Sequence, residues 1–397
     1  KTGWRAPSPG TLPTAGGSGR AMPLDRVIHL AKMTGAAGSE GHLLALLPGL
    51  RARGVDARLW MLVEPGNPVQ AYVDRIEARG VPVERIVIRR HLDPGLWQRL
   101  TAHLRQARPD LVHTHLIHAD LYGIPAARRA GVRGVISSRH NDDRFRRWLP
   151  FRVLSRWLWR QADAGIAISE AIRRFAIAVE GVSPDKIHTV HYGLDPATLQ
   201  APPDARARLR AELGLPPGAL LAGSVCRLIA QKGLNNALDA FGQVAAECPA
   251  AHYVIAGDGS LRGALEAQAA RLGLADRAHF LGWRADAPAV LAALDVLLAP
   301  SRWEGFGLVF LEAMALGVPV ISTRVSAIPE VVADGETGWL VPPSDPAAIA
   351  GALRAALSDP DERRRRGEAG RARLESQFTV DTMVQRTLAV YRGVLDG

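Results

Sequence analysis

The chain has 397 residues, enough for two or three domains at roughly 150 residues each. Hydrophobic residues make up 47% and charged residues 22% of the chain, a balance that excludes a disordered or fibrous protein. No run of about 18 uncharged apolar residues is present, so a membrane-spanning helix is not expected. Cys226 and Cys248 are the only cysteines, which excludes a disulfide framework and a four-thiolate zinc site and favours a reducing, cytoplasmic setting.

The formal net charge of +10 is unevenly distributed along the chain. Residues 1–200 carry a balance of +12, whereas residues 201–397 carry a balance of −2. This asymmetry predicts that the first half meets something anionic, such as a phosphorylated substrate, an acidic membrane surface or a nucleic acid. An arginine-rich composition with no such partner is an equally weighted alternative, because net charge bears on association and not on fold or chemistry.

Short apolar, β-prone runs alternate with amphipathic helical patterns from residue 27 onward. This alternation predicts a parallel sheet with helices on both faces. Residues 1–22 are rich in Pro, Gly, Ala, Ser and Thr without a signal-peptide core, so we expect a flexible leader there. The first series of expected strands is 27–30, 57–63, 83–88, 110–115, 134–138, 165–169 and 187–191, with helices such as 40–53, 94–107 and 119–130 between them.

The series is interrupted at residues 193–217, which hold several prolines and one expected helix at 204–213, so we place a linker there. A second series of strands is expected at 220–226, 252–256, 279–281, 295–299, 318–322 and 338–341, and the last stretch, 361–395, is expected to be helical. The sequence therefore predicts two doubly wound α/β domains. Because ligands of open α/β sheets bind outside the carboxyl ends of the strands, the cleft between the domains is the expected active site.

The densest chemical signal lies in residues 299–332. A strand ends there, a glycine-containing loop follows, and a helix is expected to start near Phe306 and Gly307, which creates an anion site from free amides and the helix dipole. Glu304 lies in the loop and Glu312 eight positions later, a separation on the order of 10 Å along a helix. That spacing allows one carboxylate to bind sugar hydroxyls and the other a ribose, with a diphosphate between them. A surface location for Glu312 is the alternative, but its apolar neighbours favour a buried carboxylate that needs partners.

Arg227 and Lys232 follow the first strand of the second series. Two cations at the carboxyl end of a strand can neutralise a diphosphate without a metal. Such residues are commonly only surface residues, but the paired glutamates in the same domain favour phosphate binding. The one Asp-x-Asp triplet, residues 359–361, lies at an expected helix start, where acidic residues are ordinary, so no metal site is expected.

Taken together, these motifs resemble a known family. Glu304-Gly-Phe-Gly followed by Glu312 is similar to the paired-glutamate signature of retaining nucleotide-sugar glycosyltransferases of family 4, which have the two-domain GT-B fold. Arg227 and Lys232 match the phosphate-binding pair of that family, and the segments 256–259, 280–282 and 335–340 match other parts of its donor domain. The resemblance covers residues 24–392, nearly the whole chain.

The resemblance implies a role for each matched residue in the second half. Glu304 would contact the donor sugar hydroxyls and Glu312 the ribose hydroxyls, while Arg227 and Lys232 would bind the diphosphate and stabilise it as it leaves. The segment with Leu281 and Trp283 would lie against the nucleobase. The residues whose amides would bind the sugar and the diphosphate are Gly305, Phe306, Gly307 and Leu308.

Two segments of the first half match the family as well. Gly38 lies in A-G-S-E-G-H, which matches a glycine-rich loop after the first strand and would let the backbone approach a phosphate; a simple tight turn is the alternative. His140 follows the strand 134–138 where the family has an active-site histidine, so we expect it to be catalytic together with Arg227, Lys232 and Glu304.

Several other residues near the expected cleft carry weaker signals. His113 and His115 alternate on one strand face, a spacing that suits a metal pair, but the family has histidines there without metal, so core packing or an acceptor-side wall is favoured. Residues 169–170 match a segment at the floor of the cleft. Tyr192 stands where the family usually has Asn, and residues 326–327 are Ser-Ala where two glycines are common, which leaves the donor sugar open.

Residues 144–160 contain six arginines and three tryptophans. Arg152, Arg156 and Arg160 fall on one stripe of a helix. We favour a crossover helix whose aromatics pack on the sheet while its arginines face water. The alternative is a membrane interface or a site for a lipid-linked or phosphorylated acceptor.

The sequence thus predicts an α/β protein with two Rossmann-like domains facing a cleft and C-terminal helices packing back toward the first domain. We expect a leader at 1–22, an acceptor-side domain at 23–200, a nucleotide-sugar donor domain at 201–378 and a returning helix at 379–397.

The expected function is metal-independent, cofactor-free hexosyl transfer with retention. A UDP-sugar is the favoured donor and a GDP-sugar the alternative. The acceptor would be a hydroxyl of a glycan, of a lipid-linked or phosphorylated saccharide or of a small polyol. Transfer would occur by front-face attack, with the departing phosphate oxygen taking the acceptor proton. The expected location is cytoplasmic, with peripheral contact to an acidic membrane and no nucleic-acid partner. The alternatives are a non-catalytic nucleotide-sugar-binding protein and a nucleotide-sugar epimerase on the same fold.

Overall fold

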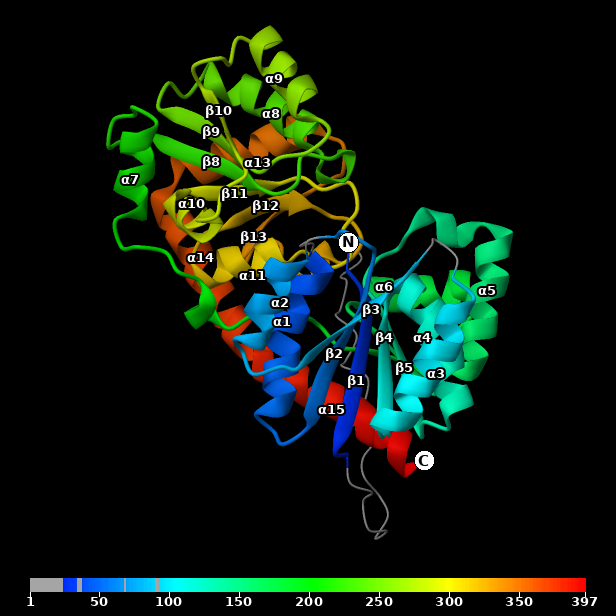
Figure 1. The fold of residues 1–397 in the computed structure, drawn as a ribbon. Coiled ribbons are helices and arrows are strands. Elements are labelled where there is room, and N and C mark those ends of the chain that lie inside the picture. The colour runs from blue at the N-terminus through cyan, green and yellow to red at the C-terminus, as the bar shows by residue number, and fades with distance from the viewer. Residues whose placement is uncertain (1–23, 34–37, 68, 90–92) are drawn as a thin grey trace.

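Two separate parallel sheets, one in each half of the chain, organise the protein (Figure 1). The structure is a computed structural model that describes residues 24–33, 38–67, 69–89 and 93–397. The first sheet has the strand order β3-β2-β1-β4-β5-β6-β7. Its strands are β1 (Arg26–Lys32), β2 (Asp56–Val63), β3 (Val83–Val87), β4 (Leu111–His115), β5 (Gly134–Arg139), β6 (Ala164–Ala167) and β7 (Ile187–Thr189).

The second sheet repeats the doubly wound pattern in the order β10-β9-β8-β11-β12-β13. Its strands are β8 (Leu220–Val225), β9 (Ala251–Ala256), β10 (Ala278–Gly282), β11 (Val296–Ala299), β12 (Val320–Thr323) and β13 (Gly338–Val341). All thirteen expected strands are present within two residues of their predicted ends, because most are short apolar runs that are buried on both faces, as in β4, β5, β6 and β9. The predicted α/β fold with two facing domains is confirmed.

Helices cover both faces of each sheet (Figure 1). The first lobe contains α1 (Gly38–Arg51), α2 (Gln70–Glu77), α3 (Gly95–Ala107), α4 (Leu116–Ala130), α5 (Leu149–Gln161) and α6 (Glu170–Phe175). The second lobe contains α7 (Ala205–Glu212), α8 (Leu234–Ala245), α9 (Arg262–Arg271), α10 (Ala287–Ala293), α11 (Leu308–Ala315), α12 (Ile328–Val331), α13 (Pro346–Ser358) and α14 (Pro360–Gln377). Short helical turns are η1 (Arg144–Arg147), η2 (Ala176–Glu180), η3 (Pro184–Lys186), η4 (Pro196–Thr198) and η5 (Ala230–Lys232).

The last helix, α15 (Val380–Asp396), returns to the first lobe. It packs against α1, β5 and β6, as its red ribbon shows in Figure 1. The stretch predicted as continuously helical is therefore two helices, which are separated at Phe378 and Thr379. Thr379 has extended backbone, and its hydroxyl accepts from the Thr382 amide, so it caps the new helix.

The chain crosses between the lobes at two adjacent points. The Leu194 amide donates to the Phe378 carbonyl over 2.9 Å. A Cβ on Gly193 would lie 2.3 Å from the Thr379 carbonyl oxygen, so only glycine fits where the two crossings touch. This arrangement places the carboxyl ends of both sheets opposite one another.

A buried cluster of paired charges lies beneath β5. Arg139, at the end of that strand, donates to Asp120 of α4 over 2.6 Å and to Glu180 of η2 over 2.8 Å. Arg146 of η1 donates to the second Glu180 oxygen over 3.1 Å. The Trp159 indole of α5 donates to Glu180 as well, over 2.9 Å. Two arginines thus balance two carboxylates, and the cluster connects η1, η2 and α5 to the strand that precedes His140.

Four histidines within the same sheet or at its carboxyl end are buried and neutral. His29, His113, His115 and His140 are at most 3% exposed. Burial lowers the pKa of His29 to about 3, with a smaller contribution from neighbouring His42. Burial also lowers the pKa of the other three well below the ordinary value, and neighbouring histidines add to the effect.

These histidines predict how stability depends on pH. In the unfolded chain each binds a proton near its ordinary pKa of 6.5, whereas the folded protein keeps it neutral far below that value. Stability should therefore be fully present above about pH 6.5 and decrease on acidification, by up to about 1.4 kcal/mol per pH unit for each histidine.

Urea unfolding across about pH 5.5 to 7.5 measures this dependence. The His113→Gln variant, which has one proton-binding ring fewer, should lose the contribution of one histidine to the slope, up to about 1.4 kcal/mol per pH unit. A free energy of unfolding that stays constant over this range would contradict neutral burial of these side chains.

Candidate active site

Lys232 and Glu304, both predicted site residues, form an ion pair at the carboxyl end of the second sheet. Lys232 in η5 donates to Glu304 Oε2 over 2.5 Å. The Ser301 hydroxyl lies 3.5 Å from the same oxygen. The two loops that carry the pair are packed closely, since a Cβ on Gly233 would lie 2.2 Å from the Pro300 carbonyl oxygen. The pair is largely shielded from solvent and holds a carboxylate and an ammonium side by side.

Glu312 and Arg227 complete the predicted donor set, and neither is satisfied by the protein. The Glu312 carboxyl on α11 is partly buried, and burial raises its pKa. No described residue forms a hydrogen bond or an ion pair with this carboxylate, and its contact with a ribose stays a prediction. Arg227 follows β8, is exposed, and makes no ion pair within the described part of the chain. A carboxylate and a guanidinium are thus left for a ligand.

The glycine-containing loop between β11 and α11 closes against the first lobe. A Cβ on Gly305 would lie 2.4 Å from the His140 carbonyl oxygen, so the loop requires glycine there. The Gly305 carbonyl accepts from the Ser169 hydroxyl over 2.9 Å. Gly307 has a left-handed backbone, and α11 begins after it at Leu308, slightly later than predicted.

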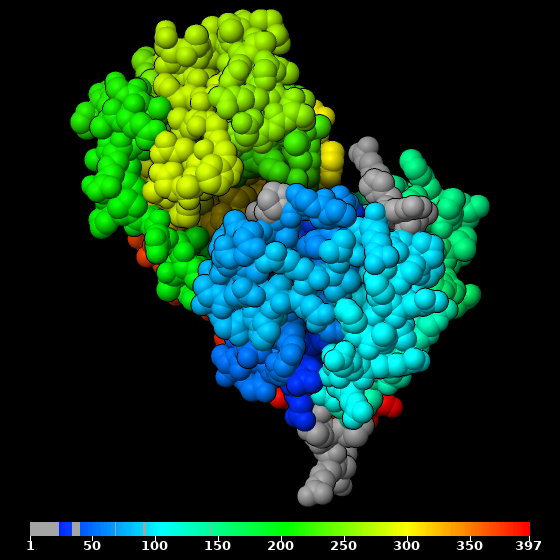
Figure 2. Space-filling view, viewed as in Figure 1, coloured from blue at the N-terminus to red at the C-terminus, as the bar shows by residue number. Residues whose placement is uncertain are grey.

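The N-terminus of α1 faces this loop across the cleft. Gly38 is the first residue of α1, so residues 38–42 of the predicted glycine-rich loop form the first turns of a helix, and Ala37 lies outside the described residues. A Cβ on Gly41, one turn further, would lie 3.4 Å from the Leu308 side chain. Two helix N-termini, those of α1 and α11, therefore meet in the cleft, where both favour an anion. Figure 2 shows the surface hollowed where the two lobes meet.

His140 lies at this junction, but its ring is engaged within the first lobe. Its Nδ1 is 2.5 Å from the Tyr192 hydroxyl and its Nε2 is 3.1 Å from His115 Nδ1. Only its carbonyl oxygen, against Gly305, reaches the second lobe. The structure thus places His140 beside the donor loop, as predicted, with both ring nitrogens already paired.

Leu281 and Trp283 lie at the carboxyl end of β10, at the edge of the second sheet. Trp283 is exposed and Leu281 is half-buried. Strand β9 separates β10 from β8, which precedes Lys232, and strands β9 and β8 separate β10 from β11, which precedes Glu304. A ligand that contacts all of these residues would therefore have to extend from the end of β10 to the end of β11. That extent suits a nucleotide sugar.

Glu330 is a cleft residue whose role the sequence reasoning missed. Its carboxylate, on α12, accepts from the Glu170 and Ala171 amides at the N-terminus of α6, over 2.7 and 2.8 Å. It also lies 3.2 Å from His191 Nε2. A carboxylate at a helix N-terminus is stabilised by the free amides. The family match at residues 169–170 was the one signal in the sequence that pointed to this contact, but Glu330 lies 160 positions from Glu170 in the sequence.

Ser326, one of the two departures from the family pattern, has a left-handed backbone with φ of 45°. Glycine adopts this conformation without strain, which explains why glycine is common in this loop. Ser326 would restrict the donor sugar only through direct contact with it, so this residue does not identify the sugar.

Ring nitrogens of buried histidines also come close together. Two groups, His29, His113 and His115 and then His42, His115 and His140, place their nitrogens within 4.8 Å. Both nitrogens of His29, His113, His115 and His140 already have hydrogen-bond partners. This pairing favours a packed polar interior. That the enzyme needs no metal stays a prediction.

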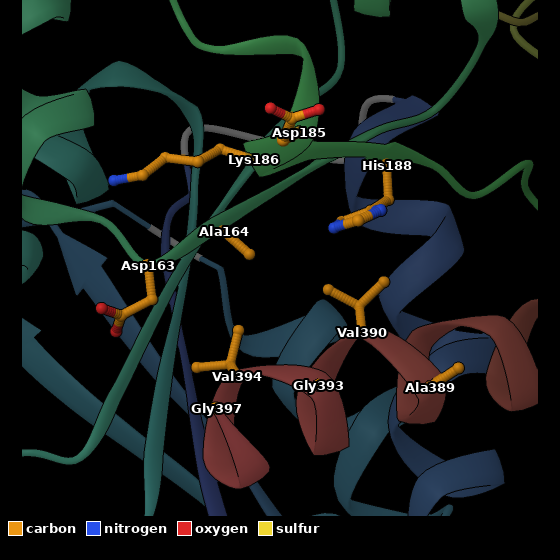
Figure 3. Close-up of a pocket in the computed structure, with 10 residues that line it drawn as sticks. All are labelled: Asp163, Ala164, Asp185, Lys186, His188, Ala389, Val390, Gly393, Val394 and Gly397. Atoms are coloured by element: carbon orange, nitrogen blue, oxygen red, sulfur yellow. The ribbon is translucent and has the colours of Figure 1, made fainter. Parts of the chain in front are cut away.

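A separate cavity of about 410 Å³ lies away from the cleft (Figure 3). It is bounded by α15 and by Asp163, Lys186 and His188 around β6 and β7. Asp163 and Lys186 precede their strands, so the cavity opens near the amino ends of the sheet. Ligands of doubly wound sheets bind at the opposite ends.

Comparisons with known proteins agree with this geometry. Residues 205–373 match the family described as glycosyl transferases group 1, and residues 36–198 match glycosyltransferase family 4. A glycogen synthase of Mycobacterium tuberculosis is 30% identical over 303 residues, covering 72% of this chain and 69% of its own. A GDP-mannose-dependent phosphatidylinositol monomannoside mannosyltransferase of Mycolicibacterium smegmatis is 35% identical over 258 residues, covering 62% and 67%.

Among solved structures, Anabaena HepE in complex with UDP and glucose superposes with a TM-score of 0.81 at 24% identity. The match covers 93% of this chain and all of that one, which supports the fold. With the two lobes, the facing helix N-termini and the glutamate–lysine pair, these matches show that the chain belongs to glycosyltransferase family 4 and is a GT-B glycosyltransferase that uses a nucleotide-sugar donor.

Proposed function

We propose that the protein transfers a hexose, with retention and without a metal, from a UDP-sugar to an acceptor hydroxyl borne by an anionic or lipid-linked molecule. The observation that carries this proposal is the Lys232–Glu304 pair together with Glu312 in the middle of α11, which has no partner among the described residues. A sugar against Glu304, a diphosphate against Lys232 and Arg227, and a ribose against Glu312 would satisfy each of these side chains.

The cations would supply the main catalytic effect. The bond between the anomeric carbon and the phosphate oxygen breaks, and charge develops on the diphosphate beside Lys232 and Arg227. The acceptor oxygen bonds to the anomeric carbon from the same face, and its proton passes to the departing phosphate oxygen. Because the two cations take the leaving charge, no metal is assigned to this step.

The base of the donor is proposed from similar proteins. UDP and glucose occupy the solved HepE complex, which favours a UDP-sugar. The mannosyltransferase of Mycolicibacterium smegmatis is named as GDP-mannose-dependent, so GDP-sugars belong in the same screen. A non-catalytic binding protein would bind one of these donors without transferring or hydrolysing it, and an epimerase would convert it to another sugar nucleotide.

A second surface bears on the acceptor. Trp148 and Leu149, at the start of α5, are 65% and 71% exposed, and Val153 and Trp157 on the same helix are exposed as well. The prediction that the aromatic side chains of this segment pack on the sheet is wrong for Trp148 and Trp157, which are exposed. Trp159 is buried, but Trp157, two positions earlier, lies on the other side of the helix.

Exposed arginines lie on the same segment as these apolar side chains. Arg147, Arg156 and Arg160 are exposed beside the four apolar side chains of α5. Apolar groups with arginines on the same segment complement the interface of an anionic bilayer, where the apolar groups enter the acyl boundary and the arginines meet phosphates. None of the described helices is long and apolar enough to cross a bilayer. We therefore include peripheral attachment to an anionic membrane, from the cytoplasmic side, in the proposal.

Removing the negative charge of Glu304 tests the donor site. The Glu304→Gln variant should lose about 100-fold or more in kcat, because Lys232 loses its partner and the sugar loses a charged acceptor. The Glu312→Gln variant should chiefly raise the donor KM, since the ribose contact is made equally in the ground and transition states.

Thermal stabilisation by a panel of nucleotide sugars identifies the donor. Steady-state kinetics then give kcat and the donor KM of each variant, and NMR of the product gives its anomeric configuration. Glu266→Gln is the matched control, because Glu266 is an exposed glutamate of the same lobe that is paired with Arg262. Full activity in Glu304→Gln would contradict the site, and inverted configuration in the product would contradict retention.

Vesicle binding tests the surface on α5. The protein should bind phosphatidylglycerol vesicles at low salt and less at high salt, because the arginine contribution is screened. Leu149→Ser should weaken binding by roughly tenfold, the effect of withdrawing one leucine from an apolar phase.

Leu272→Ser, an exposed leucine of the second lobe, is the control and should bind as the unmodified protein does. Failure to bind phosphatidylglycerol vesicles at low salt would exclude membrane attachment and leave the donor chemistry untouched.

A further inference from the structure

A continuous chain of hydrogen bonds crosses the interior of the first lobe and ends at the active site. It contains four histidines, two tyrosines and one serine, all buried. Its links are Ser138 Oγ–His113 Nε2 at 2.7 Å, His113 Nδ1–Tyr391 OH at 2.7 Å, Tyr391 OH–His29 Nε2 at 3.2 Å, His29 Nδ1–His115 Nε2 at 3.0 Å, His115 Nδ1–His140 Nε2 at 3.1 Å and His140 Nδ1–Tyr192 OH at 2.5 Å.

The chain connects elements that are far apart in the sequence. Its histidines come from β1, β4 and the end of β5, and Tyr391 comes from α15. Tyr192 adjoins the crossing between the lobes, and its ring contacts Phe306 of the donor loop at a centroid distance of 5.3 Å. Tyr192 is also the position where the family usually has Asn, so its hydroxyl completes a chain that an asparagine would have to complete differently.

Two patterns of protons satisfy every link and also the Tyr391 hydroxyl proton, whose described partners are both in the chain. A neutral imidazole has one N–H and one lone pair, so each ring donates at one nitrogen and accepts at the other. The Tyr391 hydroxyl likewise donates once along the chain, either to His29 or to His113. Following the links in either direction gives the same tautomer at all four rings, with the proton on Nδ1 throughout or on Nε2 throughout.

We propose that this chain is a tautomer lock, in which Tyr391, His29, His113 and His115 are positioning residues that hold His140 in the same tautomer as the other three rings. The proposal rests on the proposed function only in taking His140 as an active-site residue. Its consequence is that the packing of α15 on the first lobe, through the Tyr391 hydroxyl, couples the tautomer of His140, beside the donor loop, to those of His29, His113 and His115.

Nitrogen-15 NMR of ring-labelled histidine tests the lock in the full-length protein, because protonated and unprotonated ring nitrogens have separate shifts. The four rings, assigned through their mutual contacts, should all carry the proton on the same type of nitrogen. Unlike tautomers among the four would overturn the proposal. Zinc bound in stoichiometric amount by the purified protein would also overturn it, because a metal would occupy ring nitrogens that the lock requires.

The Tyr391→Phe variant cuts the chain without touching His140. Losing one hydroxyl leaves too little space for a water. His113 Nδ1 and His29 Nε2 both lose their partner, and a buried orphan N–H is less tolerated than a buried lone pair. The proton should therefore move off both atoms, which leaves His113 protonated on Nε2 and His29, His115 and His140 protonated on Nδ1. Four rings that keep one common tautomer in this variant would overturn the lock.

Thr387→Val is the matched control on the same helix. Thr387 is buried one turn from Tyr391, and its hydroxyl donates to the Met383 carbonyl over 2.8 Å, outside the chain. This variant should keep one common tautomer at all four rings even if it lowers stability. The spectra need no substrate, so a failed lock and a failed transferase assignment are separable. If the transfer rate changes in Tyr391→Phe while His140 keeps its proton on the same nitrogen, Tyr391 does not act through the tautomer of His140, and the lock is overturned.

Discussion

The buried charge cluster beneath β5 is the constraint on which the first lobe depends. Arg139 and Arg146 are withdrawn from water, and the enclosure is tolerable only because Asp120 and Glu180 balance them with direct hydrogen bonds. Leaving such a charge unpaired costs about 3–5 kcal/mol. Because Arg139 immediately precedes His140 and Glu180 holds the Trp159 indole of α5, one cluster fixes both the active-site histidine and the helix that presents the exposed apolar surface.

The two lobes divide the chemistry unequally. The second lobe holds the charged side chains that suit a nucleotide sugar, and it does so with loops that need glycine at Gly305 and Gly307. The first lobe contributes backbone and neutral groups to the boundary, including the His140 carbonyl and the Ser169 hydroxyl. Part of its surplus positive charge lies in the exposed arginines of η1 and α5, Arg147, Arg156 and Arg160. The paired cluster adds none, because its two arginines are balanced by two carboxylates.

The positions of the strands could be predicted from the sequence, because parallel strands that are buried on both faces consist of short runs of apolar residues. The sequence was also sufficient to place Glu304 in a loop and Glu312 on the helix that follows, because both lie within one short segment. It was insufficient where partners are remote: Glu330 meets α6 from 160 positions away, and Tyr391 meets His113 from 278 positions away. The exposure of Trp148 and Trp157 was misjudged because helical periodicity shows that a helix has two faces but not which aromatic lies on which.

The paired crossings at Gly193 and Thr379 have a mechanical consequence. The two segments that join the lobes contact each other at Gly193 and Thr379, so both pass through one place, which can act as a single hinge axis. Rotation of one lobe about this axis changes the width of the cleft without separating the two segments. Helix α15 lies beyond the crossing and packs on the first lobe, so it travels with that lobe although it follows the second in sequence. During such a rotation the histidine chain moves as a rigid body. Only its Tyr192 end, which touches Phe306 of the other lobe, changes its surroundings with the angle between the lobes.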